Sequence, residues 1–270
     1  MSHPNAAFVG SIPENYDRYL GPVLFEPYAA DLAQRISVRD NGRLLELACG
    51  TGIVTRRLRD RLPRTVQIVA TDLNEAMMSH AAQKFARAEN VEWKQADASD
   101  LPFEDQSFDA ITCQFGIMFF PDKLQAMREA FRVLKPGGTF WFSVWDAIER
   151  NELALTAHTI VAKYFDDNPP DFYEVPFSFH DPSEIERLLA TAGFTQIEVT
   201  PLAFTSNSSS AKDVARGLVH GNPIIASLRE RCESRIPEIE ADVESEVASR
   251  YGAAPVKAKM QALICSAVCD

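Results

Sequence analysis

The sequence predicts an α/β fold in which a doubly wound, mostly parallel seven-stranded sheet carries helical cap insertions. Three observations lead to this prediction. From Arg43 onward, short apolar segments alternate with amphipathic ones. The connections between them are short, which favours parallel strands joined by right-handed crossovers. A glycine cluster follows the first apolar segment, as expected where a buried strand turns directly into a helix.

The first five strands follow one another between residues 43 and 145. Each is expected from a short apolar or alternating run, and the runs cover residues 43–47, 67–71, 91–94, 108–114 and 139–145. Helices are expected between them over residues 52–62, 74–88 and 123–134. Asn74 suits the N-cap of the second helix, and Lys135-Pro136-Gly137-Gly138 is expected to end the third by its turn chemistry.

The rest of the chain completes the sheet and is interrupted by two insertions. A helix is expected over residues 182–192, with the last two strands over 198–204 and 260–268. The first insertion spans residues 147–181. The second spans residues 206–255, opens with a serine-rich hinge at 206–210 and ends in an acidic helix at 238–250. The predicted ligand-binding domain is therefore 1–146 plus 182–205 plus 256–270, with both insertions capping the edge of the sheet where ligands bind.

Composition excludes several classes of protein. The chain has 270 residues, which fits one large domain, and its 46% hydrophobic and 24% charged residues argue against global disorder. The net charge of −11 makes nucleic acid an unexpected partner, because phosphate contacts need clusters of Lys and Arg. No run approaches the ~20 apolar residues of a membrane helix. The five cysteines are scattered without a metal-binding spacing, so we expect a reduced, cytoplasmic protein without a metal site.

The glycine-rich turn from Glu46 to Gly52 is the most informative segment. Free N–H groups at the start of the following helix would bind an anionic group. Both dinucleotides and S-adenosylmethionine bind to turns of this kind. A dinucleotide fingerprint needs a third small residue, where this chain has Thr55. The carboxylate of Glu46 would repel a pyrophosphate but suits the ammonium group of a methionine moiety.

Two further acidic residues follow the second and third strands. Asp72 lies twenty residues beyond Gly52, where a carboxylate can accept both ribose hydroxyls of either ligand. Asp97 can accept from the adenine amino group, and the amide of Ala98 can donate to a ring nitrogen. Acidic groups at three successive strand ends fit a cationic sulfonium ligand better than a polyphosphate.

These motifs together resemble the class I S-adenosylmethionine-dependent methyltransferases, and in particular the branch that acts in ubiquinone and menaquinone biosynthesis. The resemblance is carried by the turn at residues 46–52, Asp72-Leu73-Asn74, Asp97-Ala98, Phe108-Asp109 leading to Gln114-Phe115-Gly116, and Leu134-Lys-Pro-Gly-Gly138. It covers residues 13–146 well, is weaker for residues 182–205 and the last strand, and is absent from the insertions. It implies a Rossmann-like methyltransferase fold, S-adenosylmethionine as cofactor and S-adenosylhomocysteine as product.

The resemblance also implies which residues hold the cofactor. Glu46, Ala48 and Gly50 would hold the methionine end, and Asp72 the ribose. Leu73 would stack on the adenine, and Asp97 and Ala98 would contact the edge of this base. Gln114, which ends the fourth strand, would offer its backbone carbonyl to the amino group of the cofactor. Relatives cover the cofactor with N-terminal lid helices, which points to Tyr19. The complete set of predicted cofactor-binding residues is Tyr19, Glu46, Ala48, Gly50, Asp72, Leu73, Met77, Asp97, Ala98 and Gln114.

The predicted function is methyl transfer to a small, apolar or aromatic acceptor, and the sequence assigns no catalytic base. A nicotinamide-dependent oxidoreductase and a non-catalytic S-adenosylmethionine-binding protein remain alternatives, and a homodimer is left open. Asn168-Pro169-Pro170 looks like the signature of methyltransferases that act on planar amino groups, but it lies far from the fourth strand and is interpreted as a loop. His158 and His220 lie in the insertions, where either could face the substrate.

Overall fold

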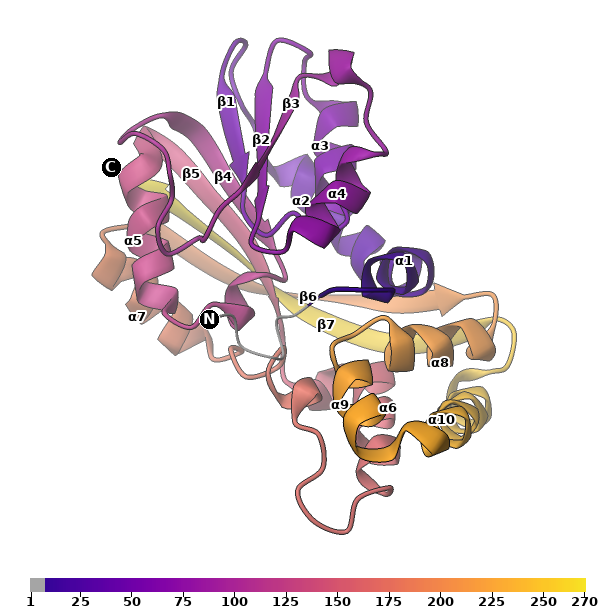
Figure 1. Cartoon of the computed structure of the whole chain (residues 1–270). Coiled ribbons are helices and arrows are strands. Elements are labelled where there is room, and N and C mark those ends of the chain that lie inside the picture. Colours follow the sequence, from indigo (N-terminus) through magenta and orange to yellow (C-terminus); the bar gives the residue numbers. More distant parts are fainter. Residues whose placement is uncertain (1–7) are drawn as a thin grey trace.

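The computed structural model describes residues 8–270 and contains the expected seven-stranded sheet (Figure 1). The strand order is β3-β2-β1-β4-β5-β7-β6. The first four junctions are parallel, and β7 runs antiparallel to both of its neighbours. The prediction of a mostly parallel sheet is therefore confirmed. The strands are β1 Arg43–Glu46, β2 Gln67–Asp72, β3 Val91–Gln95, β4 Phe108–Gln114, β5 Leu134–Trp145, β6 Thr195–Ser208 and β7 Val256–Cys269.

Helices cover both faces of the sheet. The core helices are α2 Glu26–Arg35, α3 Ile53–Arg61, α4 Glu75–Ala82, α5 Lys123–Val133 and α7 Pro182–Ala192. Successive side chains of a strand point to opposite faces. Leu44 of β1 therefore joins a buried cluster with residues of α2 and α3, whereas Leu45 joins a second cluster with residues of α5 and α7. Both faces of β1 are thus buried, as is usual for parallel strands.

A second group of helices lies at one end of β6 and β7, away from α5 and α7 (Figure 1). It consists of α6 Glu152–Ala162, α8 Ala211–His220, α9 Ile224–Cys232 and α10 Ile236–Tyr251. Helix α10 packs against α8 and α6, and α6 packs against β7. The N-terminal part contributes α1 Ile12–Asn15 and the π-helix η2 Tyr16–Phe25, which contacts α8 on one side and α2 on another. Short 3₁₀ turns occur at Arg87–Glu89, Ile117–Phe119, Ile148–Arg150, Phe172–Glu174 and Glu233–Arg235.

Most of the serine-rich segment at 206–210 belongs to strand β6, where the sequence predicts a hinge. Strand β6 continues to Ser208, where it pairs with Val256, and β7 begins four residues before the predicted start. Ser206 is buried, and its hydroxyl donates to the carbonyl of Ala258 at 3.0 Å. Pairing with β7 satisfies this backbone, so the loop preference of serine is overridden by a partner that is distant in the sequence.

Two other boundaries also differ from the prediction. Helix α4 ends at Ala82 rather than near residue 88, since Ala86 is extended and its N–H donates to Glu89 Oε1 at 2.8 Å. The segment Lys135-Pro136-Gly137-Gly138 lies within β5 rather than in a separate turn. Leu134 pairs with Phe108, and Gly138 pairs with Cys269, which draws the segment into the sheet.

Candidate active site

A cavity of about 450 Å³ opens at the carboxyl ends of the parallel strands, between the sheet and the cap helices. This volume lies within the range of small-molecule sites, and the position is the one at which open α/β sheets bind ligands. The sheet side of the lining includes Ala48, Gly50, Asp72, Leu73, Met77, Asp97, Ala98 and Gln114. Eight of the ten predicted cofactor residues therefore surround one space, and the other two are Glu46 and Tyr19.

The turn after β1 brings backbone to the cavity without side chains in the way. Ala48 and Gly50 both have positive φ, of 51° and 54°, a conformation that is costly for alanine and ordinary for glycine. A hydrogen bond to the neighbouring strand β2 fixes the turn, because Cys49 N donates to the carbonyl of Thr71 at 2.9 Å. Gly116 allows the end of β4 to lie close by, since a Cβ there would come within 2.5 Å of Ala48 Cβ. Strain of this kind is typical of functional sites.

Asp72 connects the second strand to this turn. Its Oδ2 accepts from the backbone N–H of Gly50 at 2.8 Å, and its Oδ1 accepts from the N–H of Asn74 at 2.7 Å. The side chain is only 6% exposed, and burial raises the pKa of the carboxyl despite these two N–H donors. The carboxylate therefore lines the cavity while it also orders the glycine turn.

Glu46 lies at the end of β1 beside a smaller pocket, which shares Tyr16, Phe25 and Gln114 with the main cavity. Glu46 is 2% exposed, and burial raises its pKa to about 8. Its Oε2 and the Oε1 of Gln114 are both buried without a hydrogen-bond partner among the described residues. Buried acceptors without partners are rare and costly, so this pocket is suited to a cationic hydrogen-bond donor.

Asp97 and Ala98, predicted at the edge of the adenine, follow β3, which lies on the opposite side of β2 from β1. Asp97 is exposed at the cavity, and its Oδ1 accepts from the backbone and hydroxyl of Ser99 at 2.8 and 2.6 Å. Leu73 is 45% exposed, although it is a large apolar side chain on the cavity wall. Met77, in the first turn of α4, is buried. An apolar surface with hydrogen-bonding groups at its edge suits a planar base.

Tyr19 does not line the cavity, which differs from the sequence prediction. Its ring packs between Arg18 and Arg216, whose guanidinium carbons lie 5.2 and 5.6 Å from the ring centroid. Tyr16 lines both pockets instead and stacks on Phe25 at 4.6 Å. Both tyrosines belong to η2, and the sequence carries no signal of its π-helical geometry.

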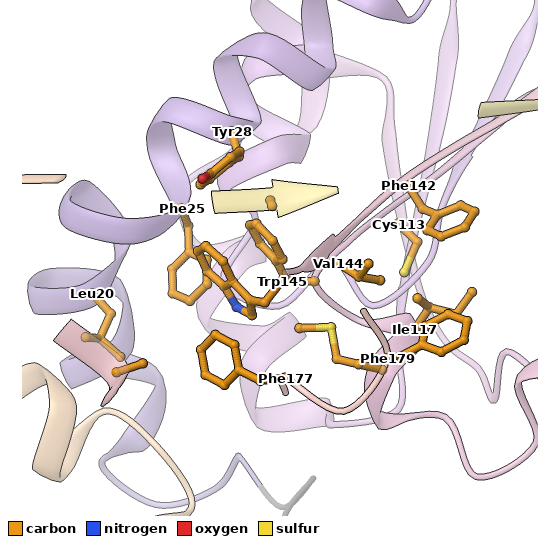
Figure 2. Close-up of a cluster of buried hydrophobic side chains, with 14 of the residues drawn as sticks. Leu20, Phe25, Tyr28, Cys113, Ile117, Phe142, Val144, Trp145, Phe177 and Phe179 are labelled. Atoms are coloured by element: carbon orange, nitrogen blue, oxygen red, sulfur yellow. The ribbon is translucent and has the colours of Figure 1, made fainter. Parts of the chain in front are cut away.

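Aromatic side chains form the wall beyond the strand ends. Phe115 and Trp145 stack with centroids 3.9 Å apart and planes 8° apart, and Phe25 lies within 6 Å of both. Figure 2 shows Phe25, Trp145 and Phe177 gathered from the N-terminal segment, β5 and the first insertion. Of the apolar run after β4, Phe115, Met118, Phe119 and Phe120 line the cavity, whereas Ile117 belongs to the core. Sequence reasoning missed Phe25, Trp145 and Phe177, which are far apart in the chain.

Both predicted insertions contribute to the cavity wall. The first provides Asn151, Leu153, Ala154, Phe172, Tyr173, Pro176 and Phe177, and the second provides Ser206, Leu218 and Asn222. The two candidate histidines lie elsewhere: His158 packs edge-on to Tyr173, and His220 Nε2 lies 2.9 Å from Glu240 Oε2. Asn168-Pro169-Pro170 is a loop, as predicted, and the carbonyl of Asn168 accepts from Arg231 at 2.7 Å.

Sequence comparison identifies a relative that decides the family. The chain is 31% identical over 207 residues to the demethylmenaquinone methyltransferase of Staphylococcus aureus, and the match covers 70% of this chain and 84% of that protein. The chain belongs to the class I S-adenosylmethionine-dependent methyltransferases. A family model described as a methyltransferase domain matches residues 45–142. The protein is therefore an enzyme of this class with S-adenosylmethionine as its cofactor, and the nicotinamide alternative is set aside.

Solved structures agree with this fold. The YcgJ protein of Bacillus subtilis superposes with a TM-score of 0.59 at 20% identity, covering 90% of this chain and 98% of that one. Phosphoethanolamine N-methyltransferase 2 of Haemonchus contortus, in complex with phosphomonomethylethanolamine and S-adenosylhomocysteine, superposes with a TM-score of 0.59 at 17% identity. That match covers 95% of this chain and 56% of the other.

The residues of the site fit the methyltransferase cofactor. The unpartnered oxygens of Glu46 and Gln114 offer acceptors for an ammonium group, and the exposed Leu73 offers an apolar surface for a base. Within residues 8–270 no cluster of three or more His, Cys, Asp or Glu side chains could hold a metal ion. Across the same range, no helix has both the length and the apolar character needed to cross a bilayer.

Proposed function

We propose that the enzyme transfers a methyl group to a small, apolar or aromatic acceptor held between the strand ends and the cap. The observation that carries this proposal is the continuity of one cavity from Asp72 and Asp97 to an aromatic wall that includes Phe177 of the first insertion. The name of the Staphylococcus aureus relative gives a quinone as its acceptor, which supports an acceptor of this chemical class.

The cofactor would lie along the ends of β1, β2 and β4. Glu46 would pair with the ammonium group, and the backbone near Gly50 would bind the carboxylate. Asp72 would accept from the ribose hydroxyls. When bound, S-adenosylmethionine supplies a methyl group activated by its positively charged sulfur.

The adenine would lie against Leu73 and Met77, with Asp97 and Ala98 at its edge. Tyr16 would cover the cofactor in place of Tyr19, because Tyr16 lines both pockets. Each assignment matches a side chain of the right chemistry to its place on the cavity wall.

The aromatic wall would orient the acceptor and exclude water. Positioning alone can supply a large part of the rate in a displacement reaction, through effective molarities of roughly 10⁵ M or more. Tyr173 is the phenol on the cap side, but its hydroxyl donates to the carbonyl of Leu218 at 2.8 Å, and burial raises its pKa well above the usual value. Tyr173 is therefore a wall residue, and no proton transfer is assigned to it.

The test is turnover with deuterated S-adenosylmethionine against two sets of acceptors. One set contains hydroquinones, naphthols and catechols, and the other contains small polar amines. We expect labelled product from the first set by mass spectrometry, with an equal amount of S-adenosylhomocysteine. The matched control is the Phe177→Ala variant, in which the acceptor KM should rise while S-adenosylhomocysteine affinity stays within about twofold. Turnover of the polar amines alone would refute the proposed acceptor class.

A further inference from the structure

The N-terminal segment and the glycine turn are joined by one lysine. Lys84 follows the end of α4, and its Nζ donates to the backbone carbonyl of Thr51 at 2.9 Å. The same ammonium group is paired with the carboxylate of Asp17, in the first turn of η2. His80 Nε2, one turn earlier on α4, lies 3.4 Å from the other oxygen of Asp17.

We propose that Lys84 is a positioning residue that holds the N-terminal segment closed over the bound cofactor. The proposal rests on the cofactor location given above. Asp17 directly follows Tyr16, which lines both pockets, and Thr51 directly follows Gly50, whose backbone is proposed to bind the carboxylate of the cofactor. A single ammonium group therefore links η2, which lines the cavity, to the glycine turn after β1.

The geometry favours this role over a contribution to global stability. The side chains of Lys84 and Asp17 are 33% and 25% exposed, and ion pairs with this much access to water contribute little to the free energy of unfolding. Although burial opposes it, the hydrogen bond from Lys84 and the nearby His80 lower the pKa of Asp17, so the carboxylate is ionised at neutral pH. Losing the pair should therefore free η2 locally while the core remains folded.

The other side of η2 is held by packing that does not involve Lys84. A Cβ on Gly217 of α8 would come within 2.7 Å of Leu20, so η2 lies directly against the cap. Residues Leu20, Leu24 and Phe25 of η2 also line the main cavity. Release of the Asp17 end would leave the segment attached to the cap but free to move away from the glycine turn, which gives the cofactor a path out.

The experiment compares the full-length wild type with Lys84→Met, Asp17→Asn and the double variant. The dissociation rate and Kd of S-adenosylhomocysteine are measured by stopped-flow fluorescence and calorimetry, and thermal unfolding is followed without ligand. Each single variant should raise the dissociation rate roughly two- to fivefold, as expected for the loss of a partly exposed ion pair. The double variant should be no faster than Lys84→Met, because both changes break the same contact.

Three comparisons make the result decisive. Lys84→Arg keeps a cation beside Asp17 and should restore slow release, and it also serves if Lys84→Met does not fold. Arg35→Met breaks an ion pair of similar exposure with Asp31 on α2, neither of which lines the cavity, and should release ligand at the wild-type rate. Unchanged release from both single variants would overturn the proposal. If Asp72→Asn also leaves binding unchanged, the proposed cofactor location fails as well; if it weakens binding, only the role of Lys84 is refuted.

Discussion

The carboxylate of Asp72 accepts the backbone N–H of Gly50 at 2.8 Å, so one acidic side chain both orders the glycine turn and faces the cavity. Asp72→Asn should weaken S-adenosylhomocysteine binding by about tenfold or more, because a hydrogen bond to a charged group is worth about 1.5–3 kcal/mol. Isothermal titration calorimetry measures the change directly. Asp31→Asn, which removes a surface partner of Arg35 on α2, is the matched control. Equal affinities of the two variants would exclude Asp72 from the ribose site.

The buried carboxyl of Glu46 should make the stability of the ligand-free protein depend on pH. Burial raises its pKa from 4.5 to about 8, so the protonated form is favoured in the folded state. The associated stability is fully present below pH 4.5 and is lost as the pH rises through about 8. Glu46→Gln should therefore lose less stability than the wild type between about pH 4.5 and pH 8 in thermal unfolding. Parallel pH profiles for the two proteins would show that Glu46 does not titrate in this range.

The same carboxyl should release a proton when the ligand binds. An ammonium group beside Glu46 favours the ionised form, so binding of S-adenosylhomocysteine near neutral pH should displace up to about one proton. Calorimetry in buffers with different ionisation enthalpies counts the protons released. Glu46→Gln should release fewer protons and bind more weakly, whereas equal release from both proteins would contradict the pairing.

Tyr16 and Tyr19 provide a direct test of how the N-terminal segment faces the site. Tyr16→Leu should weaken S-adenosylhomocysteine binding by roughly three- to tenfold, because it removes a stacked ring from both pockets. Tyr19→Leu removes a ring that packs between two arginines outside the cavity and should leave affinity within about twofold. The reverse ranking would restore Tyr19 as the covering residue and argue against the geometry of η2.

Asp109 should stabilise the fold from the end of the sheet opposite the site. It accepts from Arg43 N at 2.9 Å and pairs with Lys135 at 2.8 Å and with Arg39 at 2.8 Å. Although burial opposes it, these partners lower the pKa of Asp109. Its stabilising contribution is therefore present above its unfolded-state pKa and is lost as the pH falls through the lower folded-state value.

Asp109→Asn should reduce the free energy of unfolding at pH 7 by about 2 kcal/mol, measured by urea denaturation. The difference from wild type should shrink at acidic pH, where the wild-type carboxylate becomes protonated. Arg39→Met removes only the partner whose side chain is 72% exposed, so its effect should stay within about 0.5 kcal/mol. A large loss from Arg39→Met would place the stabilisation in the exposed pair instead.

The parts of the fold that follow local rules could be predicted from the sequence. Strands β1 to β4 and the glycine turn are specified by contiguous residues, so Glu46 and Asp72 could be placed at neighbouring strand ends before any coordinates. The lengths of β6 and β7 could not be predicted, because Ser206 and Ser208 adopt strand structure only through pairing with Ala258 and Val256.

The aromatic wall of the cavity could not be predicted from the sequence either. Phe25, Trp145 and Phe177 come from three separate segments and meet only after the chain has folded. Tyr16 was missed for a different reason, since a π-helix shifts the angular spacing on which helical patterns depend. Cavity-lining groups at strand ends are thus easier to predict than an aromatic wall that is assembled from separate segments.

The long antiparallel pair of β6 and β7 determines how the segment between them is attached to the sheet. Its final rung joins Ser208 to Val256, so everything between them leaves and re-enters the scaffold at adjacent points. A segment anchored in this way can be exchanged for another of different length while the ladder beneath keeps its register. Exchange of this segment would change the part of the cavity wall that Leu218 and Asn222 form, without altering the strand ends that carry Glu46 and Asp72.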